Sequence, residues 1–108
     1  MSKPAMTTPD VPQELLQFRE RIDSIDEEIL AALARRFAVT ERVGRLKAQH
    51  GLDSVDPVRE QEKLQRLSAS AEQKGLDGKL VHELFQRIFN EVVKNHRQLL
   101  AAAQQGAK

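Results

Sequence analysis

Apolar residues recur at helical spacing over an unusually long stretch of the chain, from Gln13 to about His50. The steps between them are mostly three and four residues, which places them on one stripe of an α-helix. No proline or glycine interrupts this stretch before Gly44, and Gly51 is a suitable residue to end it. We therefore predict one continuous helix, whose apolar stripe comprises Leu15, Phe18, Ile22, Ile25, Ile29, Leu33, Phe37, Val43 and Leu46.

The length of this helix has a consequence for assembly. About 38 residues at about 1.5 Å each give a rod of about 57 Å. A compact chain of this size has a radius of gyration of only about 13 Å. The helix must extend beyond its own subunit, and its apolar stripe needs a second chain to cover it. We expect an entwined helical homodimer.

Two further helices are predicted after this one. Asp56-Pro57 is a strong helix start, with Asp as the N-cap and Pro in the first position, and Gly75 is a natural stop. Asp77 is a suitable cap for a third helix, from Gly78 to about Ala103. In the second helix (57–74), the residues expected to face inward are Val58, Leu64, Leu67 and Ala71. In the third helix, the residues expected to be buried are Leu80, Val81, Leu84, Phe85, Ile88, Val92 and Leu99.

The expected organisation is all-α with a single domain. Residues 1–9 are small, polar and broken by proline, so we expect a flexible arm, followed by Asp10 as the first N-cap. The helical domain covers residues 10–104, and residues 105–108 form a frayed tail.

Composition narrows the possible functions. The 17 basic and 16 acidic residues give a net charge of +1, which argues against a nucleic-acid partner. The chain has no cysteine, and His50, His82 and His96 lack the spacing of a metal site, so no metal is expected. No apolar run approaches the roughly 20 residues that span a bilayer, and the amino terminus does not resemble a signal peptide. We expect a soluble, cytoplasmic protein without a membrane partner.

Two cations fall on the apolar side of the first helix. Arg36 lies seven residues after Ile29, and Lys47 lies four after Val43. Charge there is costly unless it is paired. Arg36 could extend past its apolar neighbours to water or pair with Glu41 or Glu62, and Lys47 could simply complement the helix dipole.

Considered together, several polar residues favour a ligand site. Arg36 and Lys47 are eleven residues apart, which places them on one face about 16 Å from each other. If the second helix folds back along the first, Arg59 and Glu60 join them, and His96 approaches from the third helix. His96 alone is more typical of a core or boundary histidine. Such a pocket suits a small dianion that carries a hydroxyl group. No nucleophile and base are paired, so an enzyme built this way would act by positioning and electrostatics.

Several short motifs resemble the AroQ class of all-α chorismate mutases. The first is Phe18-Arg19-Glu20-Arg21-Ile22-Asp23-Ser24-Ile25-Asp26. It is followed, in the order and spacing of that family, by Ala34-Arg35-Arg36, Val43-Gly44-Arg45-Leu46-Lys47, Val55-Asp56-Pro57-Val58-Arg59-Glu60, Gly75-Leu76-Asp77 and Leu84-Phe85. The resemblance covers about residues 13–100.

The resemblance implies an entwined homodimer of three-helix chains with two shared active sites. The implied reaction is the Claisen rearrangement of chorismate to prephenate in phenylalanine and tyrosine biosynthesis, which needs no cofactor. Arg19 from the partner chain, with Arg36 and Arg59, would bind the two substrate carboxylates. Lys47 would donate to the ether oxygen, and Glu60 with the backbone of Asp56 would hold the ring hydroxyl.

Two positions depart from the family pattern. His96 stands where many members have a glutamine that donates to the ether oxygen, a role that a histidine N–H can also fill. Val92 stands where some members have a serine that contacts a carboxylate.

Three alternatives remain open. The first is an isochorismate-pyruvate lyase of the same fold, whose members carry an apolar residue where this chain has Glu60. A 4-amino-4-deoxychorismate mutase is also disfavoured by Glu60. A non-catalytic helical dimerisation module would explain the long helix but not the shared face of Arg36 and Lys47.

Overall fold

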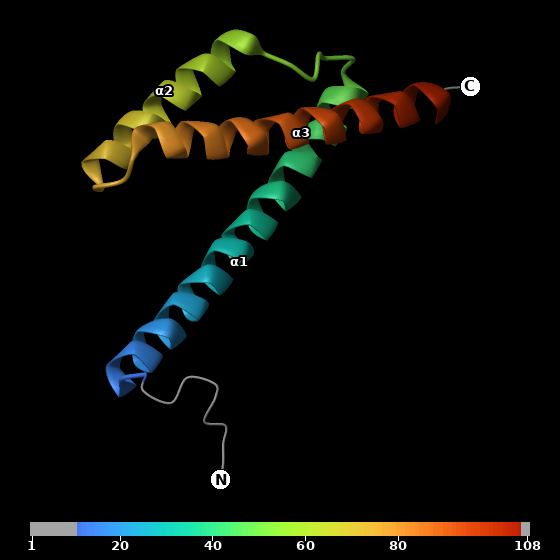
Figure 1. The fold of residues 1–108 in the computed structure, drawn as a ribbon. Helices are drawn as coiled ribbons and strands as arrows, with labels where there is room; N and C mark the ends of the chain where they lie inside the picture. The colour runs from blue at the N-terminus through green and yellow to red at the C-terminus, as the bar shows by residue number, and fades with distance from the viewer. Residues whose placement is uncertain (1–10, 107–108) are drawn as a thin grey trace. The chain divides into compact units, whose positions relative to one another are not determined.

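The protein is built from helices, as seen in a computed structural model that describes residues 11–106 (Figure 1). In chain order these are α1 (Gln13–Gln49), α2 (Pro57–Gln73) and α3 (Gly78–Gly106). No strand occurs in the described range, so the all-α prediction with one very long first helix is confirmed. The expected arm at residues 1–9, the Asp10 cap and the last two residues lie outside the described residues.

The end of α1 is fixed by a glycine. Gly51 has a φ of 66°, a conformation that costs a glycine little. It allows the backbone N–H of Leu52 to donate to the carbonyl of Lys47 (2.9 Å), and its own N–H donates to that of Ala48 (3.3 Å). These bonds satisfy carbonyls that the helix end would leave without partners. The predicted stop at Gly51 is confirmed.

The bounds of α2 follow from side-chain capping and from a second glycine. The carboxylate of Asp56 accepts a hydrogen bond from the backbone N–H of Arg59 (3.2 Å), with Pro57 in the first helical position. Gly75, with a φ of 77°, lets the N–H of Leu76 donate to the carbonyl of Ala71 (2.9 Å). The start and stop that the sequence predicted for this helix are therefore confirmed.

A close contact joins the end of α2 to the start of α3. The backbone N–H of Gly78 donates to the carboxylate of Glu72 (3.0 Å), and the hydroxyl of Ser68 donates to the Gly78 carbonyl (3.1 Å). A Cβ at Gly78 would lie 2.6 Å from the Ser68 hydroxyl, so this approach requires glycine. The hairpin buries a small core of Leu64, Ala71, Ile88 and Phe89.

Not every apolar residue on the predicted inner faces is buried in the single chain. Val58 is 69% exposed, Leu80 59% and Leu84 53%. The expectation that they face inward was wrong for the single chain, because a hairpin of two helices covers only part of each apolar stripe.

The third helix is longer than the sequence predicted. It continues to Gly106, three residues beyond Ala103, so Gln105 and Gly106, the first two residues of the expected tail, are helical. The reason is local, because Ala101 to Gln105 are residues of good helix propensity and no proline interrupts them.

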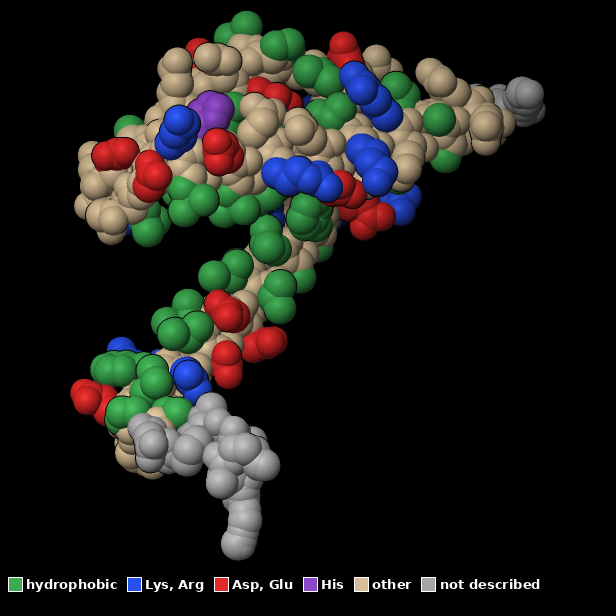
Figure 2. Space-filling view, viewed as in Figure 1, with side chains coloured by type: hydrophobic (Ala, Val, Ile, Leu, Met, Phe, Trp, Pro, Cys, Tyr) green, Lys and Arg blue, Asp and Glu red, His purple; other side chains and the backbone are tan. Residues whose placement is uncertain are grey.

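The chain consists of two compact units, one ending at Arg36 and one beginning at Phe37. The described part of the first unit is the amino-terminal stretch of α1. Its apolar side chains lie in contact with water, and Figure 2 shows them along this helix: Phe18 is 46% exposed, Ile22 56% and Ile29 53%. The second unit contains the end of α1 with α2, α3 and the core. None of the described helices is long and apolar enough to cross a membrane.

Candidate functional site

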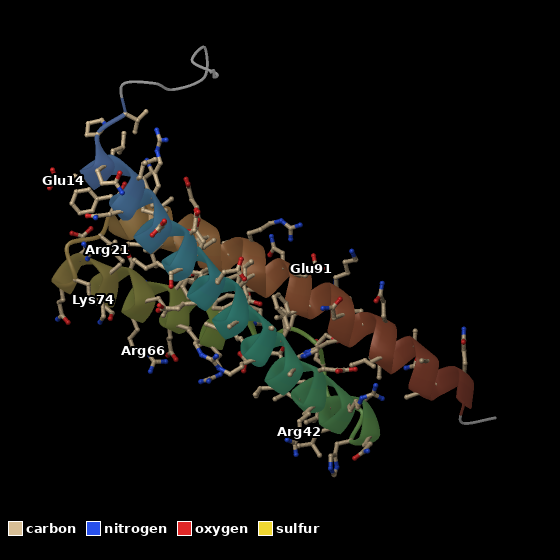
Figure 3. All side chains as sticks on the ribbon, turned by 90° about the horizontal axis from the view of Figure 1, so that it is seen from below. Glu14, Arg21, Arg42, Arg66, Lys74 and Glu91 are labelled. Atoms are coloured by element: carbon tan, nitrogen blue, oxygen red, sulfur yellow. The ribbon has the colours of Figure 1, made fainter. Side chains whose placement is uncertain are left out.

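Lys47 lies in the last turn of α1, within the second unit. Its backbone is held by the hydrogen bond that its carbonyl accepts from Leu52. Its side chain is half-buried, and no ion pair involves it among residues 11–106. By contrast, charged side chains such as Arg42 and Arg66 project from the helices into solvent (Figure 3). A half-buried cation without a carboxylate partner is suited to an anionic ligand.

The N-cap and first turn of α2 carry three of the predicted site residues. Asp56 is exposed and caps the helix, and its carbonyl accepts from the N–H of Glu60 (3.0 Å). Arg59 is exposed and Glu60 is half-buried, and neither forms an ion pair with any described residue. The cap thus fixes the first turn of α2, from which Arg59 and Glu60 project about 100° apart around the helix axis.

His96 is the most deeply buried of the predicted site residues, with 4% of its surface exposed. Its Nε2 lies 2.7 Å from the backbone carbonyl of Thr40 in α1. Because a carbonyl oxygen only accepts, we assign the ring proton to Nε2. The other ring nitrogen, Nδ1, is buried and has no hydrogen-bond partner among the described residues.

Gly44 makes this contact possible. A Cβ at this position would lie 2.5 Å from Cδ2 of His96 and 2.9 Å from Cδ1 of Leu99. The absence of a side chain therefore allows α1 and α3 to approach closely beside the imidazole. Val92, one turn before His96 on α3, is half-buried and offers only apolar surface.

Sequence reasoning missed the part that Thr40 and Gly44 play here. A lone glycine inside a helical pattern often marks a close backbone approach, and that signal was present at Gly44. Thr40 takes part through its backbone carbonyl, which every residue carries, so no side-chain pattern could have identified it.

The remaining two predicted site residues lie in the first unit. Arg19 is exposed and Arg36 is half-buried. Burial lowers the pKa of the Arg36 guanidinium, because leaving water disfavours its charged form. Arginine starts from so high a pKa that the side chain stays a cation at neutral pH. Glu41, one of the partners considered for Arg36, forms an ion pair with Arg45 at 2.9 Å.

The chain matches a family model over most of its length. The family is described as chorismate mutase type II, and the match covers residues 18–97. The chain belongs to this family. All eight predicted site residues, from Arg19 to His96, lie inside the matched range, so the family resemblance seen in the sequence is confirmed.

This member of the chorismate mutase type II family is similar to curated proteins with three different names. The T-protein of Haemophilus influenzae is 34% identical over 86 residues, which are 80% of this chain and 23% of that protein. The bifunctional chorismate mutase/prephenate dehydratase of Escherichia coli is 35% identical over 86 residues, 80% of this chain and 22% of that protein. The chain thus spans less than a quarter of these two relatives. The isochorismate pyruvate lyase of Pseudomonas aeruginosa is 35% identical over 102 residues, which cover 91% of this chain and all of that protein.

Proposed function

We propose that this chain is a chorismate mutase that rearranges chorismate to prephenate without a cofactor. The observation that carries the proposal is the match to the chorismate mutase type II family over residues 18–97. Lys47 is also half-buried and forms no ion pair within residues 11–106, which supports the proposal further.

The substrate in this proposal is a flexible dianion that must fold into a compact chair before it reacts. Arg19, Arg36 and Arg59 would bind its two carboxylates. Because a guanidinium donates two parallel hydrogen bonds, each arginine fixes a carboxylate in direction as well as in position. Holding the chair reduces the entropy that the substrate must still lose on the way to the transition state.

Lys47 would act on the bond that breaks. Negative charge develops on the ether oxygen as its carbon–oxygen bond lengthens, and a fixed ammonium stabilises that charge more than it stabilises the ground state. Partial burial strengthens the effect, because fewer waters screen the interaction. The rearrangement moves no proton to or from the protein, in agreement with a site that has no paired general base.

Glu60 would hold the ring hydroxyl of the substrate together with the backbone of Asp56. A half-buried carboxylate is a strong acceptor for a hydroxyl hydrogen, and the cap at Asp56 fixes the turn from which it projects. Val92 would contribute only shape to this site. His96 stands at the position of a second donor to the ether oxygen, and that role stays a prediction.

The proposal includes a homodimer with shared sites. The apolar stripe of the first unit is exposed in the single chain, which supports cover by a second copy. On a straight helix the 17 residues between Arg19 and Arg36 span about 25 Å. The two arginines of one chain cannot hold the same small ligand, so Arg19 would serve the partner's site.

A lyase that releases pyruvate from isochorismate is the second candidate. It is favoured by the match to the Pseudomonas aeruginosa protein, which is the one of these relatives that the alignment covers in full. Glu60 favours the mutase, because lyases of this fold carry an apolar residue at that position.

The two candidates are separated by offering each substrate to the purified chain. We expect the ultraviolet absorbance of chorismate to fall far faster than in buffer, with little pyruvate released from isochorismate. Pyruvate release as the faster reaction would instead establish the lyase. Loss of chorismate at the uncatalysed rate would refute the mutase.

A further inference from the structure

The imidazole of His96 has almost no freedom to act on a ligand. Its Nε2–H is bonded to the Thr40 carbonyl at 2.7 Å, and its Cδ2 packs where a Cβ of residue 44 would be. Its Nδ1 is buried, and the whole residue is 4% exposed. The Thr40 hydroxyl turns back to the carbonyl of Phe37 (3.1 Å), so the ring meets the backbone of α1 and not a side-chain hydroxyl.

This geometry limits what a neutral His96 can donate. Neutral imidazole carries a single N–H, and here the Thr40 carbonyl occupies it. The second nitrogen has a lone pair, which cannot donate to an ether oxygen or to a carboxylate. To donate to a ligand through Nε2, the ring would have to break its bond to Thr40 and move out of a buried position.

The same contact lies next to the proposed chemistry. Thr40, Gly44 and Lys47 follow one another at steps of four and three residues, so they share one face of α1. His96 packs against Thr40 and Gly44, which lie in the two turns of α1 before Lys47. A shift of the ring would therefore move the turn from which the ammonium projects, and small displacements of a catalytic group are costly.

We propose that His96 is a positioning residue, locked as the Nε2–H tautomer by the Thr40 carbonyl, that holds the Lys47 end of α1 against α3. Lys47 is then the donor to the ether oxygen, and His96 acts through it. This inference rests on the proposed mutase function for its catalytic part, whereas the tautomer and the contact with Thr40 do not depend on it.

Two substitutions test which ring nitrogen matters. The amide nitrogen of glutamine reaches about as far as Nε2 and can donate to Thr40, whereas asparagine is too short to do so. We expect His96→Gln to keep kcat within about 3-fold, and His96→Asn to lower kcat at least about 10-fold with KM nearly unchanged. His82→Gln is the matched control, since His82 is an exposed histidine on the same helix. A folded His96→Asn chain with wild-type kcat would reduce His96 to a space-filling residue and overturn the proposal.

A double-mutant cycle separates positioning from direct donation. If His96 acts through Lys47, adding His96→Asn to Lys47→Ala lowers kcat little further, because the donor that it positions is already gone. A second donor to the ether oxygen would act independently, and its loss would cost about as much in the Lys47→Ala chain as in the wild type. The additive result would overturn the proposal.

Nitrogen NMR of histidine-labelled protein tests the tautomer directly. The His96 signals are those absent from His96→Gln, and the exposed His50 and His82 serve as internal references. At mildly alkaline pH we expect Nε2 protonated and Nδ1 unprotonated, with no change on saturation with prephenate. A protonated Nδ1, or loss of the Thr40 bond with prephenate, would overturn the proposal. If the wild-type chain fails to turn over chorismate, the proposed function fails, whatever tautomer the free chain shows.

Discussion

Two neighbouring cations at the end of α1 differ in burial and in ion pairing. Arg45 is exposed and pairs with Glu41 at 2.9 Å, an i,i+4 contact of the kind that contributes little to stability. Lys47 is half-buried and forms no ion pair with any residue from 11 to 106. The two differ by two positions along one helix, and therefore form a natural pair for comparison.

Replacing Lys47 tests its assigned role. We expect Lys47→Ala to lower kcat about 10²- to 10³-fold, the usual effect of losing one fixed donor to a developing negative charge. Far-ultraviolet circular dichroism should be unchanged, because alanine is a good helix former. Arg45→Ala should leave kcat near wild type. Near-normal turnover by Lys47→Ala would show that this lysine only complements the helix dipole.

Substitutions at Asp56 can test the capping role of its side chain separately from the proposed substrate-binding role of its backbone. Asp56→Ala removes the acceptor for the N–H of Arg59 and should lower the free energy of unfolding by about 1 kcal/mol. Asp56→Ser keeps an oxygen at this position and should lose much less. Because only the backbone is assigned to the ring hydroxyl, KM for chorismate should change little in Asp56→Ser. A large rise in KM for this variant would mean that the carboxylate itself binds substrate.

At the scale of elements, glycines decide how closely the helices approach one another. A Cβ added at Gly78 would lie 2.6 Å from the Ser68 hydroxyl and 2.7 Å from the Glu72 carboxylate. A Cβ added at Gly106 would have no atom within 4 Å. Both glycines lie in α3 and neither has a positive φ. Only the first therefore has a packing reason to be glycine.

This difference predicts opposite outcomes for the same substitution. Gly78→Ala should destabilise the fold by about 1–3 kcal/mol, because the added methyl displaces both polar contacts between α2 and α3. Gly106→Ala should change stability by less than about 0.5 kcal/mol. Thermal unfolding followed by circular dichroism measures both. An unchanged unfolding temperature for Gly78→Ala would show that the end of α2 can move to accommodate the methyl group without loss of stability.

Local signals explain why helix bounds could be predicted from the sequence. Asp56, Gly51 and Gly75 act within a few residues of themselves, so their positions alone specify the ends of α1 and α2. Burial is not a local property. Val58 and Leu80 lie on apolar stripes yet are exposed, because the position of the neighbouring helix decides which part of a stripe is covered.

The same distinction applies to the site. The cations that would suit a dianion, Arg36 and Lys47, could be selected from the sequence because charge on an apolar face is unusual. The environment of His96 was not visible, because its partner is a backbone carbonyl 56 positions away. Its expected role as a donor was drawn from the family pattern, and the geometry suggests a role in positioning.

At the scale of the whole molecule, the apolar stripe of α1 is left exposed to water in the single chain. Phe18, Ile22, Ile25 and Ile29 are each about half exposed along one stripe of the first unit. Burial of apolar surface is the main favourable term in association, so a stripe of this length favours a stable partner. In the proposed homodimer a second copy would also supply Arg19 to the neighbouring site, so activity would depend on dimer formation.

Hybrid dimers test this joint claim most directly. Arg19→Ala and Lys47→Ala should each be nearly inactive alone, because each damages both sites of its own dimer. After subunit exchange half of the dimers are hybrids, and each hybrid has one site with neither substitution. We predict recovery of about a quarter of wild-type chorismate turnover, as expected for an isologous pair with two shared sites. No recovery, with hybrids verified by native mass spectrometry, would contradict a chorismate mutase site built from two copies of this chain.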